Sequence, residues 1–259
     1  AGKPCIIEAD GDVAQVTGTS ASAGTSTVFH DASTGSVDVV YDSAAQKIVI
    51  FYRDIANSSY GTAQVGTVSG TSISFGTAVV FESAGASNLG ATFDSNAGKT
   101  VVAYTSGSSS GKAVVGTVSG TSISFGTAAT FESANTQETA IVFDSDENKI
   151  VIAYKDIGNS NQGTAIVGTV SGTSISFGSA SVFHSGTTTT IGATYDTTAQ
   201  KVVIGYRDSS NTGDAIVADV SGTTLTYGTA VQFTANNAID TKVTHDSTAG
   251  KNVFVFRDL

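Results

Sequence analysis

The sequence contains no tryptophan and no methionine, and it has a single proline and a single cysteine, Cys5, in 259 residues. One cysteine excludes an intrachain disulfide and a cysteine cluster that holds zinc. Without tryptophan, the usual platform for stacking sugars is missing. Lysine and arginine together number 12 and the formal net charge is −10, which argues against a nucleic-acid partner. No apolar run is long enough to span a bilayer, so membrane insertion is not expected.

Signals for catalysis are equally scarce. Nothing in the sequence pairs the three histidines, His30, His184 and His245, with a catalytic nucleophile, and no two of them share a metal-ligand spacing. Carboxylates recur only at the same positions of a repeat, so no distinct pair suits the acid and base roles of a glycosidase. We therefore predict a protein that is not an enzyme, with no catalytic residue, no metal and no cofactor.

A long repeat organises the whole chain. Five aspartates that follow an aromatic residue or a histidine are 52, 50, 52 and 50 residues apart, and a lysine stands five residues after each. The pairs are Asp42 and Lys47, Asp94 and Lys99, Asp144 and Lys149, Asp196 and Lys201, and Asp246 and Lys251. A phenylalanine series, Phe29, Phe81, Phe131, Phe183 and Phe233, keeps the same intervals. A period of this length indicates a propeller or a solenoid.

Each unit predicts four strands. In the third unit, 140–144 leads through a short turn to the apolar run KIVIAYKD at 149–156, and a polar loop precedes TAIVGTV at 164–170. A Ser-Gly pair then leads to TSISFGSASVF at 173–183. Ser-Gly between two β-rich runs is a tight-hairpin signal, because glycine adopts positive φ at low cost. We interpret the aspartate and lysine of each pair as structural residues of the first turn.

Four strands in each of five units, with no helical periodicity, predict an all-β, five-bladed β-propeller of four-stranded antiparallel blades. The chain forms one domain, with units at 30–81, 82–131, 132–183, 184–233, and 234–259 completed by 1–29. Closure requires a two-plus-two seam, in which an N-terminal hairpin at 5–29 joins the C-terminal hairpin at 241–258. An open solenoid is the alternative. Asp38 and Lys242 are expected to lie close together across the seam.

Variation between the units falls in the loops between second and third strands and in the connections between units, which we place on one face. Four second strands end in a cation followed by aspartate, and Thr105-Ser106 takes that place in the second unit. These dyads either grip sugar hydroxyls or acidic groups, or order the adjacent loops. Tyr60 is the only aromatic residue in these loops. The candidate ligand-binding residues are Arg53, Asp54, Tyr60, Lys155, Asp156, Arg207, Asp208, Arg257 and Asp258.

The motifs YDSAAQKIVIFYRD at 41–54 and GTAIVGTVSGTSISFG at 163–178 resemble tandem-repeat propeller proteins of tailed marine phages, which are virion structural or tail-fibre components. The resemblance covers the chain from Val28 onward and implies display on a virion or an extracellular surface. We expect an adhesion or glycan-binding module with several equivalent weak sites, whose partner is a cell-surface glycan. A virion protein with an architectural role, which binds other virion proteins and no small ligand, is the alternative. A homo-oligomer is compatible with both.

Overall fold

The computed structural model describes residues 5–7, 13–15, 24–107 and 109–258. These residues form antiparallel sheets, with one short 3₁₀ helix, η1 (Ile157–Asn159). The all-β prediction is therefore confirmed. No helix in the described ranges is both long and apolar enough to cross a membrane.

The repeat is a four-stranded unit. In the first unit β3 (Thr34–Asp42), β4 (Lys47–Asp54), β5 (Tyr60–Ser69) and β6 (Ser72–Phe75) pair in chain order. The second unit repeats this order with β7 (Val79–Asp94), β8 (Lys99–Ser106), β9 (Ser110–Ser119) and β10 (Ser122–Phe125). The third contains β11 (Ala129–Asp144), β12 (Lys149–Asp156), β13 (Gln162–Ser171) and β14 (Ser174–Phe177). The fourth contains β16 (Thr189–Asp196), β17 (Lys201–Arg207), β18 (Gly213–Ser221) and β19 (Thr224–Tyr227). The fifth unit contains β21 (Ala238–Asp246) and β22 (Lys251–Asp258).

The outer edge of each complete unit consists of two pieces. A short fourth strand such as β6 covers one half of the third strand. The other half pairs with the segment that leads into the next unit: the beginning of β7, the beginning of β11, β15 (Ser181–Thr187) or β20 (Val231–Thr234). The chain thus passes from the outer edge of one unit directly to the innermost strand of the next.

The turns follow the chemistry read from the sequence. Asp42 is buried, and its Oδ1 accepts a hydrogen bond from the backbone N of Ala45 at 2.8 Å. At the outer hairpin Gly70 has φ of +58°, the left-handed conformation that favours glycine. Both turns are therefore structural, as predicted.

Aromatic rings hold successive segments together. Phe29, Phe81, Phe131 and Phe183 each pack on a buried tyrosine, with ring centroids 5.2–5.3 Å apart. These tyrosines are Tyr52, Tyr104, Tyr154 and Tyr206. Buried valine, isoleucine and alanine side chains of the second and third strands fill the space between the units.

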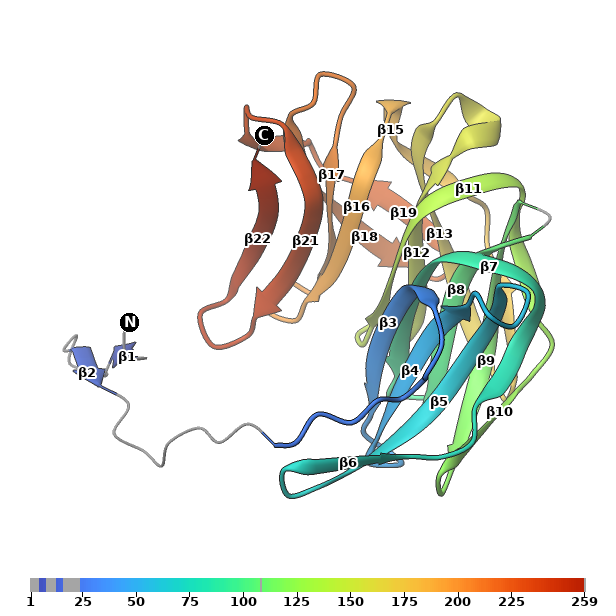
Figure 1. Cartoon of the computed structure of the whole chain (residues 1–259). Helices are drawn as coiled ribbons and strands as arrows, with labels where there is room; N and C mark the ends of the chain where they lie inside the picture. The colour runs from blue at the N-terminus through green and yellow to red at the C-terminus, as the bar shows by residue number, and fades with distance from the viewer. Residues whose placement is uncertain (1–4, 8–12, 16–23, 108, 259) are drawn as a thin grey trace.

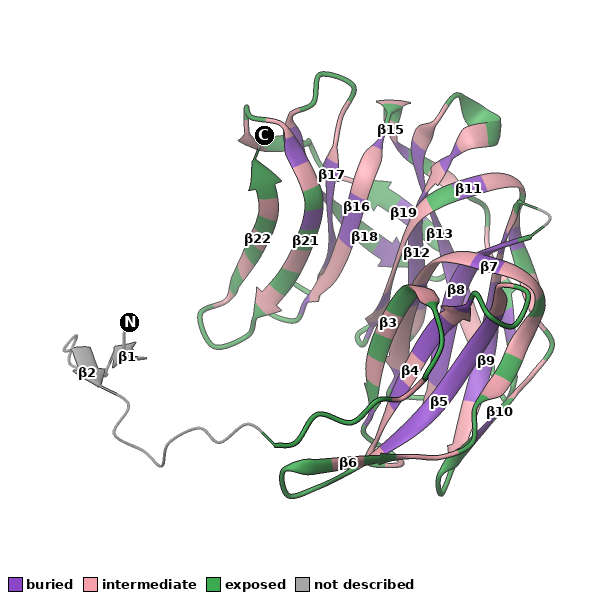
Figure 2. Cartoon of the chain, in the orientation of Figure 1, coloured by how far each residue is buried: buried purple, intermediate pink, exposed green. Residues whose placement is uncertain are grey.

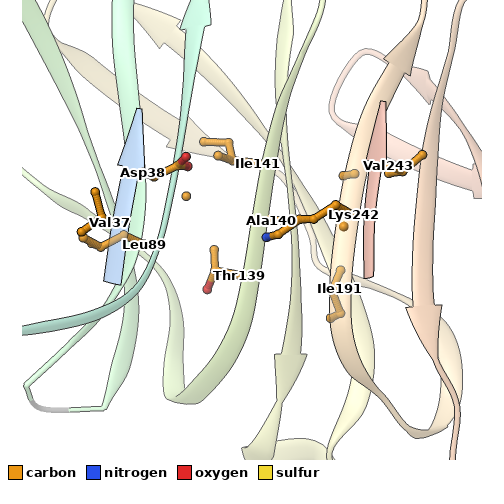
Figure 3. Close-up of a pocket in the computed structure, with 12 residues that line it drawn as sticks. Val37, Asp38, Leu89, Thr139, Ala140, Ile141, Ile191, Lys242 and Val243 are labelled. Atoms are coloured by element: carbon orange, nitrogen blue, oxygen red, sulfur yellow. The ribbon is translucent and has the colours of Figure 1, made fainter. Parts of the chain in front are cut away.

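The innermost strands β3, β7, β11, β16 and β21 follow one another in this order and line an axial hollow of about 180 Å³ (Figures 1 and 3). Asp38 and Lys242, which were expected to lie close together, both line this hollow, and no ion pair joins them among the described residues. Burial raises the pKa of Asp38, against the opposing effects of hydrogen bonds from the backbone N of Ala91 and Val39 and of the charge on Lys242.

The predicted seam is not formed by the described strands. β1 (Cys5–Ile7) and β2 (Val13–Gln15) pair with each other, and β22 pairs with β21 alone. The rest of the expected hairpin, at 8–12 and 16–23, lies outside the described residues. In the sequence, GTSASAG at 18–24 stands where the first unit has GTSISFG, with alanines at the positions of Ile73 and Phe75.

Candidate functional site

The loops and connections that vary between units lie together on one face, as predicted. The end of β4, the loop after β8, and segments of β7 and β11 all line one hollow. We call this surface the loop face and the cavity the loop-face hollow. Its volume is about 240 Å³, and it lies where the first three units meet.

The aspartates of the strand-end dyads order their own loops. Asn57 N donates to Asp54 at 3.0 Å, Asn159 N donates to Asp156 at 3.1 Å, and Ser210 N and Thr212 N donate to Asp208 at 2.8 and 2.9 Å. Asp54 also contacts His30, with 3.2 Å between Nε2 and Oδ1. Burial, and then the nearby Glu132, raise the pKa of Asp156. The loop-ordering interpretation therefore accounts for these three carboxylates.

Three other candidates lie at or next to the ends of strands. Tyr60 begins β5 and faces Asp54 across the strand pair. Asp258 accepts a hydrogen bond from Asn236 Nδ2 at 2.7 Å. Lys155 is half-buried at the end of β12, in register with Gln137 of β11.

The arginines of the dyads differ in how they are paired. Arg207 is held internally, because its Nε donates to Thr189 Oγ1 at 2.9 Å and its Nη1 donates to Asn237 Oδ1 at 2.8 Å. Arg257 is 59% exposed and forms an ion pair with Asp240 at 3.1 Å. The dyads are therefore not equivalent, which differs from the expectation of several equivalent sites.

Arg53 lacks both partners that hold Arg207. Gly35 faces Arg53 across β3 and β4, as Thr189 faces Arg207 across β16 and β17. Gly85 stands nine residues before its series aspartate, as Asn237 does in the fifth unit. The Arg53 guanidinium instead donates from Nη2 to Ser59 Oγ at 3.0 Å, and its buried Nε has no partner among the described residues.

The second unit creates the space that Arg53 borders. Thr105 replaces the strand-end cation there, and its Oγ1 donates to Thr136 O at 2.8 Å and accepts from Asn88 Nδ2 at 3.1 Å. The hollow is lined by Arg53, Gly85, Ala86, Ser87, Asn88, Thr105, Ser106, Gly107, Ser109, Asn135, Thr136 and Gln137. In the described part of the chain, Arg53 is the one charged residue of this lining. The lining combines a guanidinium with hydroxyl and amide groups, so it can bind a polar ligand by hydrogen bonds.

A β-bulge shapes this rim in every unit. The register of β7 and β8 shifts between Ser87 and Gly90, and Asn88 has φ of +50°. The equivalent residues Ser36, Glu138, Thr190 and Asp240 also have positive φ. A left-handed residue other than glycine costs roughly 1–2 kcal/mol, and bulges often redirect side chains beside functional sites.

Most residues of the loop-face hollow were not predicted from the sequence. Arg53 was a candidate, whereas the side chains of Asn88, Asn135 and Gln137 were not. The available signal was Thr105-Ser106, the one departure from the repeated dyad. The structure shows no group of three histidine, cysteine, aspartate or glutamate residues arranged for a metal ion within its described ranges.

Comparisons with known proteins are informative only at the level of structure. No protein-family model matches the chain, and no curated protein matches it. An exo-β-1,3-galactanase from Phanerochaete chrysosporium with β-1,3-galactotriose is 11% identical, with a TM-score of 0.55 over 92% of this chain and 63% of that chain. The SapL1 lectin in complex with α-methyl fucoside is 15% identical, with a TM-score of 0.51 over 82% of this chain and 68% of that chain.

A third similar structure is a mutant of AofleA from Arthrobotrys oligospora in which three evenly spaced arginines are replaced by alanine. It is 12% identical, with a TM-score of 0.56 over 85% of this chain and 63% of that chain. The chain thus spans less than two thirds of the galactanase and of AofleA. At these identities the likeness establishes only that the chain shares an all-β fold with the SapL1 lectin, AofleA and a galactanase.

Proposed function

We propose that the chain is a non-enzymatic glycan-binding module whose site is the loop-face hollow around Arg53. The observation that carries the proposal is a guanidinium that lacks the two partners of Arg207, placed in a hollow lined by hydroxyl and amide groups. The complexes of SapL1 with a fucoside and of the galactanase with galactotriose support carbohydrate as the ligand class.

The size and lining of the hollow suit one sugar residue. Its volume of about 240 Å³ is below the ~300–1,000 Å³ typical of pockets for drug-sized ligands. None of its lining residues is aromatic, so binding relies on hydrogen bonds from Arg53 and from the side chains of Asn135 and Gln137. A single site of this kind gives modest affinity, which display in many copies raises through multivalency.

The lining also favours binding over hydrolysis. Glycoside hydrolysis requires two carboxyl groups that flank the scissile bond. Neither aspartate nor glutamate is among the residues that line the loop-face hollow. The strand-end aspartates nearby are occupied by loop backbone groups. These observations support a lectin-like role.

The proposed architecture is a closed five-bladed propeller completed by the N-terminal segment. Val65, Val115 and Val167 are fully buried, whereas the equivalent Val217 is 44% exposed, because β21 and β22 alone do not cover it. Figure 2 shows the same contrast, with β22 and β3 exposed or half-buried and the second and third strands of the middle units mostly buried. Two further strands beside β22 would cover this surface.

The beginning of the described segment supports closure. A Cβ added to Gly24 would overlap the carbonyl oxygen of Thr71, as one added to Gly76 would overlap that of Thr121. Residues from Gly24 onward therefore pack on the first unit as the outer edge of a preceding unit packs on its neighbour. In a ring, that preceding unit is the fifth.

We further propose that the module is displayed on a virion or an extracellular surface and binds a cell-surface glycan. The resemblance of the repeats to phage propeller proteins supports this location. The acidic net charge of −10 suits a surface protein that must stay soluble.

A glycan array with three variants tests the binding proposal. Arg53→Gln removes the guanidinium, and Thr105→Arg introduces the long side chain that other units carry at this position. Each is expected to weaken glycan binding at least about tenfold, because hydrogen bonds to a charged group are lost or the hollow is filled. Arg207→Gln is the matched control, because Arg207 is bonded internally, and it is expected to bind as the parent does. An array without any saturable glycan signal for the parent protein would contradict the proposal.

A further inference from the structure

We infer that the sugar bound in the loop-face hollow carries a carboxylate and that Arg53 binds this group. The inference rests on the proposed function and names the ligand class for the same site. Three observations support it. In the described ranges Arg53 has no carboxylate partner, the lining of the hollow includes no carboxylate, and two glycines stand where Arg207 has its hydrogen-bond acceptors.

The two glycines beside Arg53 are not required by the backbone. A Cβ on Gly35 would meet Ile55 Cδ1 at 3.5 Å, and a Cβ on Gly85 would meet Gly107 Cα at 3.8 Å, both ordinary contacts. Neither glycine has the positive φ that disfavours side chains. By contrast, a Cβ on Gly111 would overlap the ring of Phe131. The absence of side chains at 35 and 85 therefore has no packing cause, and as a consequence Arg53 lacks the two acceptors that hold Arg207 and its Nε has no partner among the described residues.

Three cations among the described residues pair with a carboxylate, one of them being Arg257 with Asp240. Lys112 contacts Glu82 at 3.1 Å and Lys201 contacts Asp219 at 2.7 Å. Arg53 contacts the hydroxyl of Ser59 instead, in a hollow whose lining includes no carboxylate. A half-buried guanidinium without an anion is costly, and a ligand carboxylate offsets that cost with two parallel hydrogen bonds.

The remaining lining groups suit an acceptor-rich ligand. The amides of Asn135 and Gln137 supply further donors around Arg53. A carboxylate only accepts hydrogen bonds, so it matches these donors without needing an acidic residue in return. The axial hollow is a weaker anion site, because Lys242 shares it with the Asp38 carboxylate.

Isothermal titration with matched probes tests the inference. The probes are trigalacturonate and 3′-sialyllactose, each compared with its own methyl ester, which keeps the shape and removes the charge. The free acid of at least one pair is expected to bind about tenfold or more tightly than its ester. This preference is expected to shrink between 50 mM and 500 mM salt, since salt screens the interaction.

A double variant tests whether the preference for the acid requires Arg53 to be without the acceptors of Arg207, rather than merely to be present. Gly35→Thr with Gly85→Asn keeps Arg53 and restores the two acceptors that hold Arg207. It is expected to lose the preference for the acid while it still binds the neutral ester. Arg53→Lys keeps the positive charge but removes the two parallel N–H donors of the guanidinium. It is expected to lose most of the preference for the acid.

The outcomes distinguish the inference from the proposed function. Equal binding of acid and ester, or array signals from neutral sugars alone, overturns the inference and leaves glycan binding in place. A preference for the acid that survives Arg53→Gln also overturns it. If neither probe pair binds and the glycan array is blank, both proposals fall.

Discussion

Replacing Gly126 with alanine is expected to lower the free energy of unfolding by about 3 kcal/mol, at the upper end of the usual cost of overpacking. The added Cβ would overlap the carbonyl oxygen of Thr173 in the outer hairpin turn of the next unit. Both sides of this contact are backbone, so no change of rotamer relieves the overlap. Gly76 and Gly178 make the same contact with Thr121 and Thr223.

Urea denaturation measures this effect, with Gly85→Ala as the matched control. A Cβ at Gly85 comes no closer than 3.8 Å to a neighbouring atom, so this control is expected to change stability by less than about 0.5 kcal/mol. If Gly126→Ala were as mild as the control, the glycine contact would not hold successive units together.

Replacing Gly228 with alanine is expected to cost as much as replacing Gly126, although the nearest atom to a Cβ there is Val217 O at 3.8 Å. The expectation follows from ring closure. In GTSASAG at 18–24, Thr19 occupies the sequence position of Thr71 and its equivalents. A closed ring would place it against Gly228 and produce the same overlap, again worth about 3 kcal/mol.

The same denaturation experiment decides between a closed ring and an open array. In an open array the Cβ added by Gly228→Ala has no atom close to it. The variant is then expected to change the free energy of unfolding as little as Gly85→Ala does. A loss of stability below about 0.5 kcal/mol would therefore contradict the seam, while Gly126→Ala in the same series confirms that the assay detects the contact.

The strands and turns were predictable because short-range chemistry determines them. The aspartate that caps the first turn, as Asp42 does, and the glycine of the outer hairpin, as Gly70, recur at fixed intervals. Because the same pattern recurs in every unit, a strand or turn predicted in one unit is supported by the equivalent residues of the others. The bulge at Asn88 was not predicted, because a non-glycine residue with positive φ leaves no distinct mark in the sequence.

The functional site was harder to predict because it depends on departures from the repeat. The dyads suggested equivalent sites, yet internal partners hold Arg207 and not Arg53. That difference comes from Gly35 and Gly85, which belong to two units and are 50 residues apart. The register of β3 and β4 places Gly35 opposite Arg53, and the packing of the first two units places Gly85 in the same hollow as Arg53.

The most direct test of the account is a backbone-amide NMR titration with a glycan that the array identifies. The account predicts that shift changes concentrate in three segments that line the loop-face hollow: 85–88, 105–107 and 135–137. They should follow a single saturation curve and vanish in Thr105→Arg. Shift changes centred on the axial hollow at Asp38 and Lys242, or on the turns of the opposite face, would contradict it.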